Sequence, residues 1–124
     1  MPNDSNKLVG NQGELLVSDW LTAHGYRILF RNYLCRGGEL DIVAVKGSAL
    51  SFVEVKTRLS QYFDLSEVIT NSKRKRMIFA AKRYLFENAR FSDYTHQFDV
   101  ALVEKNGADF KIRYLPNAFH GTEF

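Results

Sequence analysis

Two short runs, Gly38-Glu39-Leu40-Asp41-Ile42-Val43-Ala44-Val45 and Leu50-Ser51-Phe52-Val53-Glu54-Val55-Lys56-Thr57, decide the fold of this chain. Both are rich in β-branched and apolar residues, and residues 46–49 between them suit a tight turn, so they predict a β-hairpin. Because side chains alternate along a strand, Asp41 is expected on the face of Val43 and Val45. By the same rule, Glu54 and Lys56 share a face with Phe52. Charged groups on apolar strands are costly to bury unless they are paired or metal-bound, so the hairpin also predicts a site.

The composition is that of an ordinary globular domain. The chain has 124 residues, of which 45% are hydrophobic and 25% charged, and we expect a single domain over residues 1–124. No apolar run approaches the roughly 18 residues of a membrane span, and the first residues lack the features of a signal peptide. The single cysteine, Cys35, allows no internal disulfide and no cysteine-based zinc cluster. We therefore expect a cytoplasmic protein without a membrane partner.

The basic charge is concentrated in the second half of the chain. Residues 1–64 contain 7 Lys and Arg against 7 Asp and Glu, so residues 65–124 carry the whole formal net charge of +3. The excess lies in Lys73-Arg74-Lys75-Arg76 and Lys82-Arg83. Such a patch is typical of a protein that processes a polyanion, but a solvated helix face has the same pattern.

The first predicted helix follows the capping residues 3–6 and ends at about Ala23 or His24, with Gly25 as its left-handed stop. Gly13 lies on its apolar arc and would let the helix approach a sheet closely. Glu14 lies at the edge of the arc, where it either leans toward the covered sheet or is an ordinary boundary residue. The arc consists of Leu8, Val9, Leu15, Leu16, Val17, Trp20, Leu21 and Ala23.

A second helix is predicted from Thr70 or Ser72 to about Asn88. Arg74 lies on its core face and is expected to overhang the end of the sheet. Phe79 and Phe86 lie on its outer side, either as isolated exposed aromatics or as a contact for a partner or a second copy of the chain. The core face consists of Met77, Ile78, Ala81, Tyr84 and Leu85.

The remaining segments complete an α/β pattern. Strands are expected at 26–31 and 97–104, with a hairpin partner at 109–115, whereas 32–38 and the tail 116–124 read as irregular. Residues 58–64 read as a strand end that becomes a loop, and 66–69 are either a helical turn or an extended piece. The order α-β-β-β-α-β-β predicts a central mixed β-sheet flanked by helices.

The carboxylates of the hairpin suggest metal chemistry. Twelve residues separate Asp41 from Glu54, which places the two on neighbouring strands. Carboxylate oxygens are the ligands that Mg²⁺ prefers, and the Val55 carbonyl and the Glu14 carboxylate are further candidates. Lys56 would hold the attacking water or stabilise charge on a scissile phosphate. The alternative is a structural Glu54–Lys56 ion pair, with Asp41 as an edge charge.

Further motifs occur in a specific order along nearly the whole chain. In sequence they are Gly10-Asn11-Gln12-Gly13-Glu14, Gly25-Tyr26-Arg27-Ile28-Leu29, Arg31-Asn32, Cys35-Arg36-Gly37-Gly38-Glu39-Leu40-Asp41, Phe52-Val53-Glu54-Val55-Lys56-Thr57-Arg58, Thr70-Asn71-Ser72-Lys73, Phe98-Asp99-Val100 and Asn117-Ala118-Phe119. With them the chain resembles the YraN-like family of small bacterial proteins. That family is placed with the restriction-endonuclease-like, PD-(D/E)xK nucleases, among which the chain resembles Holliday-junction resolvases.

The resemblance implies a restriction-endonuclease-like fold and a set of roles. Asp41, Glu54 and Lys56 correspond to the catalytic triad and Glu14 to a helix-borne acid; Asp41, Glu54, Val55 and Glu14 would hold Mg²⁺ or Mn²⁺. Glu39 would be a supporting acid at the strand end. Lys73 matches a lysine of the family pattern and would contact backbone phosphate. Beyond the resemblance, the basic residues Arg74, Lys75, Arg76, Arg36 and Arg58 are expected to bind nucleic acid together with Lys73.

Two positions depart from the family pattern. Gln97 stands where an arginine is usual, which puts a phosphate or structural contact in doubt, and Asn71 stands where a proline is frequent, which bears on the helix cap. The expected function is a Mg²⁺-dependent endonuclease acting on structured or branched DNA. Phe79 and Phe86 leave a homodimer open. The alternatives are a non-catalytic nucleic-acid-binding or adaptor module and a protein–protein scaffold.

Overall fold

The computed structural model describes residues 4–58 and 65–121, with side chains described for 11–58 and 67–121. The helices are α1 (Asp4–Ala23), α2 (Leu65–Val68), α3 (Asn71–Glu87) and the short 3₁₀ helix η1 (Ala89–Phe91). The strands are β1 (Arg27–Cys35), β2 (Gly38–Lys46), β3 (Ala49–Arg58), β4 (Thr95–Asn106) and β5 (Asp109–Phe119). The expected strand end and loop over 58–64 lies outside the described residues, except for Arg58, the last residue of β3.

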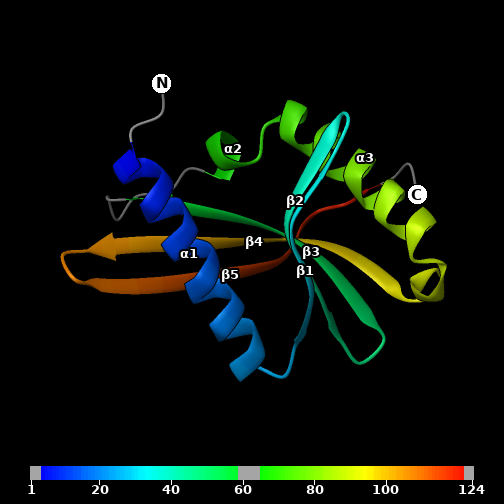
Figure 1. The fold of residues 1–124 in the computed structure, drawn as a ribbon, viewed down its shortest axis with the longest axis horizontal. Coiled ribbons are helices and arrows are strands. Elements are labelled where there is room, and N and C mark those ends of the chain that lie inside the picture. The colour runs from blue at the N-terminus through cyan, green and yellow to red at the C-terminus, as the bar shows by residue number, and fades with distance from the viewer. Residues whose placement is uncertain (1–3, 59–64, 122–124) are drawn as a thin grey trace.

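The strands form one mixed sheet in the order β1-β2-β3-β4-β5. All neighbours are antiparallel except β3 and β4, which pair in parallel from Ala49↔Thr95 to Arg58↔Glu104. The sheet is strongly twisted, so that β1 and β2 fan away from β4 and β5 (Figure 1). The mixed α/β sheet flanked by helices that the sequence predicts is confirmed.

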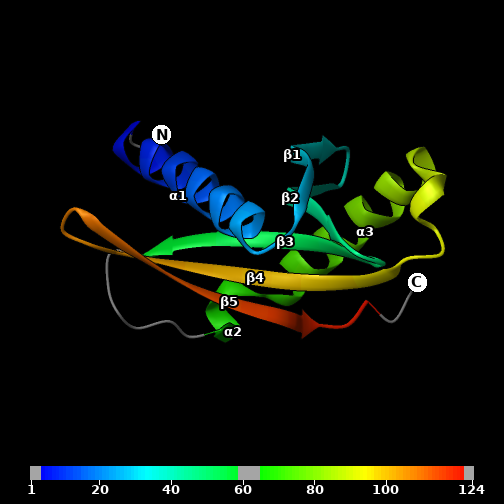
Figure 2. The same ribbon diagram turned by 90° about the horizontal axis from the view of Figure 1, so that it is seen from below.

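Two apolar clusters lie on opposite faces of the sheet. Val43, Phe52 and Val100 belong to the cluster that α3 covers. Their strand neighbours Ile42, Ala44, Val53 and Ala101 belong to the cluster that α1 covers through Val17 and Leu21. Figure 2 shows α1 and α3 over different parts of the sheet. The alternation that the hairpin pattern predicts therefore holds for Val43, Val45 and Phe52.

Two glycines let the helices approach the sheet closely. A Cβ atom on Gly13 of α1 would lie 2.1 Å from Oγ1 of Thr57, which confirms the expected close approach of this helix. A Cβ atom on Gly38 would lie 2.4 Å from the backbone oxygen of Arg76 in α3. Both contacts position a helix against β2 or β3 next to the predicted carboxylates.

The predicted loop at 32–38 is wrong, because β1 continues to Cys35. Tyr33 pairs with Leu40 and Cys35 with Gly38, so the connection shrinks to Arg36 and Gly37. Asn32 has a φ of 56° within the strand, a conformation that asparagine tolerates better than most residues. Composition alone suggested a loop here because asparagine and glycine usually break strands.

The tail at 116–124, predicted to be irregular, begins as part of a strand. β5 continues past Pro116 to Phe119, whose ring stacks on Phe98 at a centroid distance of 4.7 Å. A proline is tolerated here because β5 is an edge strand. The register shifts between Phe98 and Val100, and Asn117 has a φ of 51°, which explains why no period is visible in the sequence.

The helices match their predicted bounds to within a residue or two. Thr70 caps α3, and Gly25 has a φ of 89° after α1. Among the described side chains of the predicted apolar arc of α1, Val17 and Leu21 are fully buried, whereas Leu15 and Ala23 are exposed. Leu8 and Val9 of the arc lie outside the described side chains. Residues 65–68 resolve the ambiguous segment as a helical turn. Among the helices of the described ranges, none is long and apolar enough to cross a membrane.

A candidate metal and phosphate site between two strands and two helices

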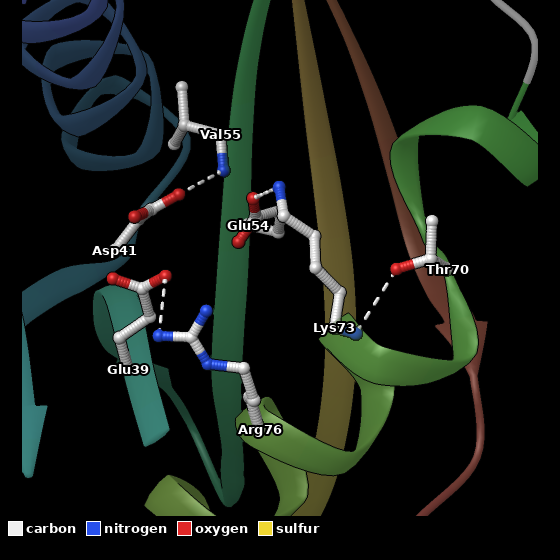
Figure 3. Close-up of polar contacts among 7 residues, drawn as sticks. All are labelled: Glu39, Asp41, Glu54, Val55, Thr70, Lys73 and Arg76. Atoms are coloured by element: carbon white, nitrogen blue, oxygen red, sulfur yellow. Dashed lines mark hydrogen bonds and ion pairs between the residues drawn. The ribbon is translucent and has the colours of Figure 1, made fainter. Parts of the chain in front are cut away.

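Asp41 lies where the ladder between β2 and β3 ends. The last backbone pair on this side is Ile42↔Val53. Beyond it, the backbone N–H of Val55 donates to Oδ2 of Asp41 at 2.8 Å (Figure 3). A side chain thus takes the place of the next ladder carbonyl, and the Asp41 carboxylate is held in the fork between the two strands.

Strict alternation fails at this same point. Leu40 belongs to the α3 cluster together with Val43 and Val45, which three residues of an unbroken strand would not all do. The alternation that assigns Asp41 to the face of Val43 and Val45 is therefore interrupted beside Asp41. The break lies between the pairs Arg31↔Ile42 and Tyr33↔Leu40, next to the left-handed Asn32.

Glu54 is the buried carboxylate of the site. Only 6% of the residue is exposed, and it accepts from the Nζ of Lys73 in the first turn of α3. Thr70 fixes this turn, because its hydroxyl oxygen accepts from the backbone N–H of Lys73 at 3.2 Å (Figure 3). The ion pair of Glu54 is thus with Lys73 on a helix, and the alternative of a structural Glu54–Lys56 pair is wrong.

The electrostatics of Asp41 reflect the crowding of acids. Burial, and next to it the Glu54 charge, raise the pKa of Asp41 to about 8, and Glu14 adds to the rise. The hydrogen bond from Val55 and the charge of Lys73 oppose it. Two carboxylates that cannot both be charged cheaply at neutral pH form a place where a cation is favoured.

Glu14 reaches the same region from α1. It is half-buried, and its Oε1 is buried without a hydrogen-bond partner among the described residues. Burial raises the pKa of Glu14, the Arg31 charge and the Asn32 side chain lower it, and the charges of Glu54 and Glu39 raise it further. Such a buried, unpaired oxygen is available to accept a hydrogen bond or to ligate a cation.

Lys56 follows Glu54 on β3 and is half-buried. Burial lowers the pKa of Lys56, and the positive charges of Lys73 and Arg58 lower it further, against the attraction of Glu54 and Asp41. A lysine whose charged form is disfavoured in this way is a better proton acceptor than a solvated one.

The predicted phosphate-binding residues are distributed around this centre. Arg76 contacts Glu39 at 3.4 Å (Figure 3). Arg74 lies over the ring of Phe119, the last residue of β5. Lys75 is exposed on α3, Arg36 is exposed in the β1–β2 turn, and Arg58 is half-buried at the end of β3. Of the group, Lys73 is committed to Glu54, a pairing that the sequence did not reveal.

The residues present suit a hard divalent cation in their chemistry. Asp41, Glu54 and Glu14 supply carboxylate oxygens, two of which share a buried region, and Oε1 of Glu14 has no partner among the described residues. Within the described ranges, however, no three Asp, Glu, His or Cys side chains stand together closely enough to hold an ion as they are placed. The ammonium of Lys73 holds the positive charge next to Glu54.

A second buried carboxylate, Asp99, was not predicted as a functional residue. It is fully buried on the α1 side of β4 and accepts from the Tyr114 hydroxyl at 2.5 Å and the Asn117 N–H at 2.9 Å. Gln97 donates to both its oxygens, at 3.1 and 3.2 Å. Gln97, the departure from the family pattern, therefore makes a structural contact. The Asp99 network ties β5 to the sheet and belongs to the fold.

Comparison with known proteins gives one family. A family model described as "Uncharacterised protein family UPF0102" matches residues 13–103. A UPF0102 protein of Geobacter metallireducens is 40% identical over 114 residues, covering 92% of this chain and 93% of its own length. UPF0102 proteins of Clostridium perfringens and Treponema pallidum are 39% and 36% identical, with 92% of this chain covered in both and 95% and 94% of their own lengths.

Proposed function

We propose that this chain, which belongs to the UPF0102 family and so to the YraN-like proteins that its motifs resemble, is a divalent-metal-dependent endonuclease for branched or otherwise structured DNA. The observation that carries the proposal is the meeting of Asp41 and Glu54 at the fork of β2 and β3. There, burial and mutual repulsion raise the pKa of Asp41 to about 8. Lys73 compensates the charge of Glu54, but gathering further carboxylates beside it has a cost that a bound cation would offset.

Asp41, Glu54 and Glu14 would hold Mg²⁺ or Mn²⁺, with the Val55 carbonyl as a further candidate. When bound, such an ion supplies positive charge that stabilises the charge developing on a scissile phosphate. In this proposal Lys73, which contacts Glu54, would give up that contact when an ion is bound and would turn to a phosphate.

Lys56 would act on the water that attacks the phosphate. The lowered pKa of Lys56 increases the fraction of neutral amine, which is the form that accepts a proton. Its position two residues after Glu54 on β3 keeps it beside the carboxylates.

The first two turns of α3 would bind the DNA backbone. Arg74, Lys75 and Arg76 are exposed there, and Arg36 and Arg58 add charge from the sheet. Contacts of this kind position a nucleic acid without reading its sequence. We therefore propose a substrate selected by shape.

The test is cleavage of a four-way junction, a flap and a linear duplex, each with Mg²⁺, with Mn²⁺ and with EDTA. We expect cleavage of a branched substrate only with metal, and a loss of at least about 100-fold in Asp41→Asn, Glu54→Gln and Lys56→Ala. Asp109→Asn, an exposed acid in the β4–β5 hairpin, is the matched control that keeps activity. Cleavage that persists in Asp41→Asn would exclude the proposed chemistry.

The second candidate is a nucleic-acid-binding or adaptor module without catalysis. The Lys73–Glu54 ion pair favours it, because an internal cation already neutralises the buried acid. This function predicts salt-dependent binding to DNA with no cleavage of any substrate under any metal. Binding would then be unchanged in Asp41→Asn.

A further inference from the structure

A groove of about 650 Å³ opens between β1 and α3. We call it the β1–α3 groove; Phe30, Leu34, Arg36, Phe79, Arg83 and Glu87 line it. Its apolar side chains are unusually accessible, since Phe30 is 47%, Leu34 72% and Phe79 51% exposed. The volume lies within the range of about 300–1,000 Å³ that is typical of small-molecule sites.

The groove is built on fixed side chains. Tyr33, which is buried beneath it, donates to Oε1 of Glu87 at 2.5 Å, and its ring meets that of Phe30 edge-on at a centroid distance of 5.6 Å. Glu87 in turn accepts from Nε of Arg83 at 3.3 Å. On the opposite side, the ring of Phe79 lies against Gly37, where a Cβ atom would be 3.3 Å from it. The rings of Phe30 and Phe79 and the guanidinium of Arg83 are thus held in place, and both rings stay exposed.

The charge around the groove selects its occupant. Arg36 and Arg83 line it, and Lys75, Arg76 and Lys82 are exposed on the same helix, whereas the acid of the groove, Glu87, is already engaged by Arg83. A second copy of the chain placed on this face would bring these cations against their equivalents, which disfavours self-association. An anionic ligand with an exposed aromatic face satisfies both the rings and the cations.

The groove borders the carboxylate site. Leu34 pairs with Glu39 across the β1–β2 ladder, and Glu39 contacts Arg76, one helical turn before Phe79. A strand whose phosphates pass Lys75 and Arg76 would therefore bring its next unit to the groove. Bases within a duplex are stacked on each other and do not offer a free face, so the unit that fits is an unpaired one.

We propose that the β1–α3 groove binds an unpaired nucleotide of a DNA strand, with the base stacked on Phe79 or Phe30 and the phosphate on Arg36 and Arg83. The inference rests on the proposed function in one respect, that the substrate is a DNA with a branch or a flap. It adds the reason for the choice of such a substrate: the nucleotide next to a branch point is one that can leave the stack.

The experiment uses a flap DNA with 5-iodouracil at single positions of the unpaired arm, bound to the Asp41→Asn protein in EDTA. Ultraviolet irradiation joins the iodouracil to an aromatic side chain in contact with it, and mass spectrometry of the peptides identifies that residue. We expect adducts on Phe79 or Phe30. Phe86, which is 84% exposed on the same helix and does not line the groove, is the internal control.

Affinity gives the second readout. Fluorescence anisotropy in EDTA should show that Phe79→Ala and Phe30→Ala weaken binding of the flap by about fivefold or more. The affinity of these variants for linear duplex should stay within about twofold of the parent's. The affinity of Phe86→Ala for the flap should also stay within about twofold of the parent's. Phe79→Tyr, which keeps the ring, should retain binding. Thermal unfolding of each variant identifies any that fail to fold. The crosslinking experiment keeps Phe30 and Phe79 in place, so it tests the proposal even if the alanine variants do not fold.

The outcomes separate the two proposals. Crosslinks to Phe79 or Phe30 without metal-dependent cleavage by the unsubstituted chain would keep the groove and reject the endonuclease. Cleavage with equal flap affinity in Phe79→Ala and Phe86→Ala, and no adduct in the groove, would reject the groove alone. Sedimentation velocity that shows a dimer, dissociated by Phe79→Ala, would also overturn the proposal, because the groove would then be an interface between copies.

Discussion

The N–H of Val55 donates to the carboxylate of Asp41 at 2.8 Å, so that a side chain ends the ladder between β2 and β3. Burial and the charge of Glu54 both disfavour the ionised form of this carboxylate and so raise its pKa. One residue therefore both terminates the sheet pairing and stores electrostatic strain, and these two effects respond differently to pH.

Asp41→Asn is expected to stabilise the metal-free protein at alkaline pH. The pKa of Asp41 is raised from 3.8 to about 8 in the folded chain. Its contribution to stability is therefore fully present below about pH 4 and is lost as the pH rises through 8. The amide keeps the shape without the charge, so the melting temperature of the variant should exceed that of the parent by about 4 °C or more at pH 9.

This difference should shrink toward zero between pH 8 and pH 4, which thermal unfolding in EDTA measures. Asp109→Asn, an exposed acid, should show no such dependence. A gain in stability for Asp41→Asn that is the same at pH 4 and pH 9 would contradict the raised pKa of Asp41.

Lys73→Met should destabilise the chain through Glu54. It removes the cation from an almost fully buried carboxylate, and leaving such a group unpaired costs about 1–3 kcal/mol of unfolding free energy. Glu54→Gln in the same chain should recover much of that loss, since the repulsion with Asp41 is removed as well. Urea unfolding of the two single variants and the double variant gives the coupling energy.

Added Mg²⁺ should raise the melting temperature of Lys73→Met more than that of the parent, because the ion no longer competes with an ammonium. Additive effects of the two substitutions on unfolding free energy would show that the Lys73–Glu54 contact contributes nothing.

Gly38→Ala should unfold or severely weaken the protein. The new Cβ would lie 2.4 Å from the backbone oxygen of Arg76 and 2.9 Å from the backbone nitrogen of Ala80. Backbone atoms of a helix cannot yield cheaply, so we expect a loss of about 3 kcal/mol or more in the free energy of unfolding. Chemical denaturation measures it.

Gly107→Ala is the control for this substitution. No atom lies within 4 Å of a Cβ there, and the cost comes from its φ of 64°, roughly 1–2 kcal/mol. Equal losses in the two variants would show that α3 can move away from β2 without penalty.

Asp99→Asn should separate the structural acid from the proposed metal site. The change weakens hydrogen bonds from Tyr114, Asn117 and Gln97 to a buried carboxylate, at a cost of about 2 kcal/mol. Trp20 stacks on Tyr114 at 4.9 Å, so its fluorescence should report the change. The Mn²⁺ affinity of the folded variant, measured by calorimetry, should match that of the parent; a loss would place Asp99 in the metal site.

The hairpin, the two helices and the approach of Gly13 to a strand follow from the sequence because each depends on local periodicity. The extent of β1 and β5 does not, because Asn32 and Asn117 adopt left-handed conformations within strands. Asparagine usually ends a strand, but Asn32 and Asn117 bend β1 and β5 without ending them. The alternation of apolar residues changes at each bend, so it does not reveal the full strand.

Within the candidate site, Asp41 and Glu54 could be predicted because they share one hairpin. The Lys73–Glu54 contact could not, since it depends on how closely α3 docks, and that depends on Gly38 in a different element. The Asp99 network likewise requires the irregular register of β4 with β5. Contacts between elements distant in the chain are the part that periodicity does not encode.

The parallel pairing of β3 with β4 has a kinetic consequence. The β2–β3 hairpin closes through Gly47 and Ser48 alone, whereas β3 and β4 meet only after the whole of α2 and α3 has been placed between them. Non-local pairing of this kind is slow to form. We therefore expect the hairpin that carries Asp41 and Glu54 to form before α3 docks on the sheet and brings Lys73 to Glu54, so that solvent ions balance its acids early in folding.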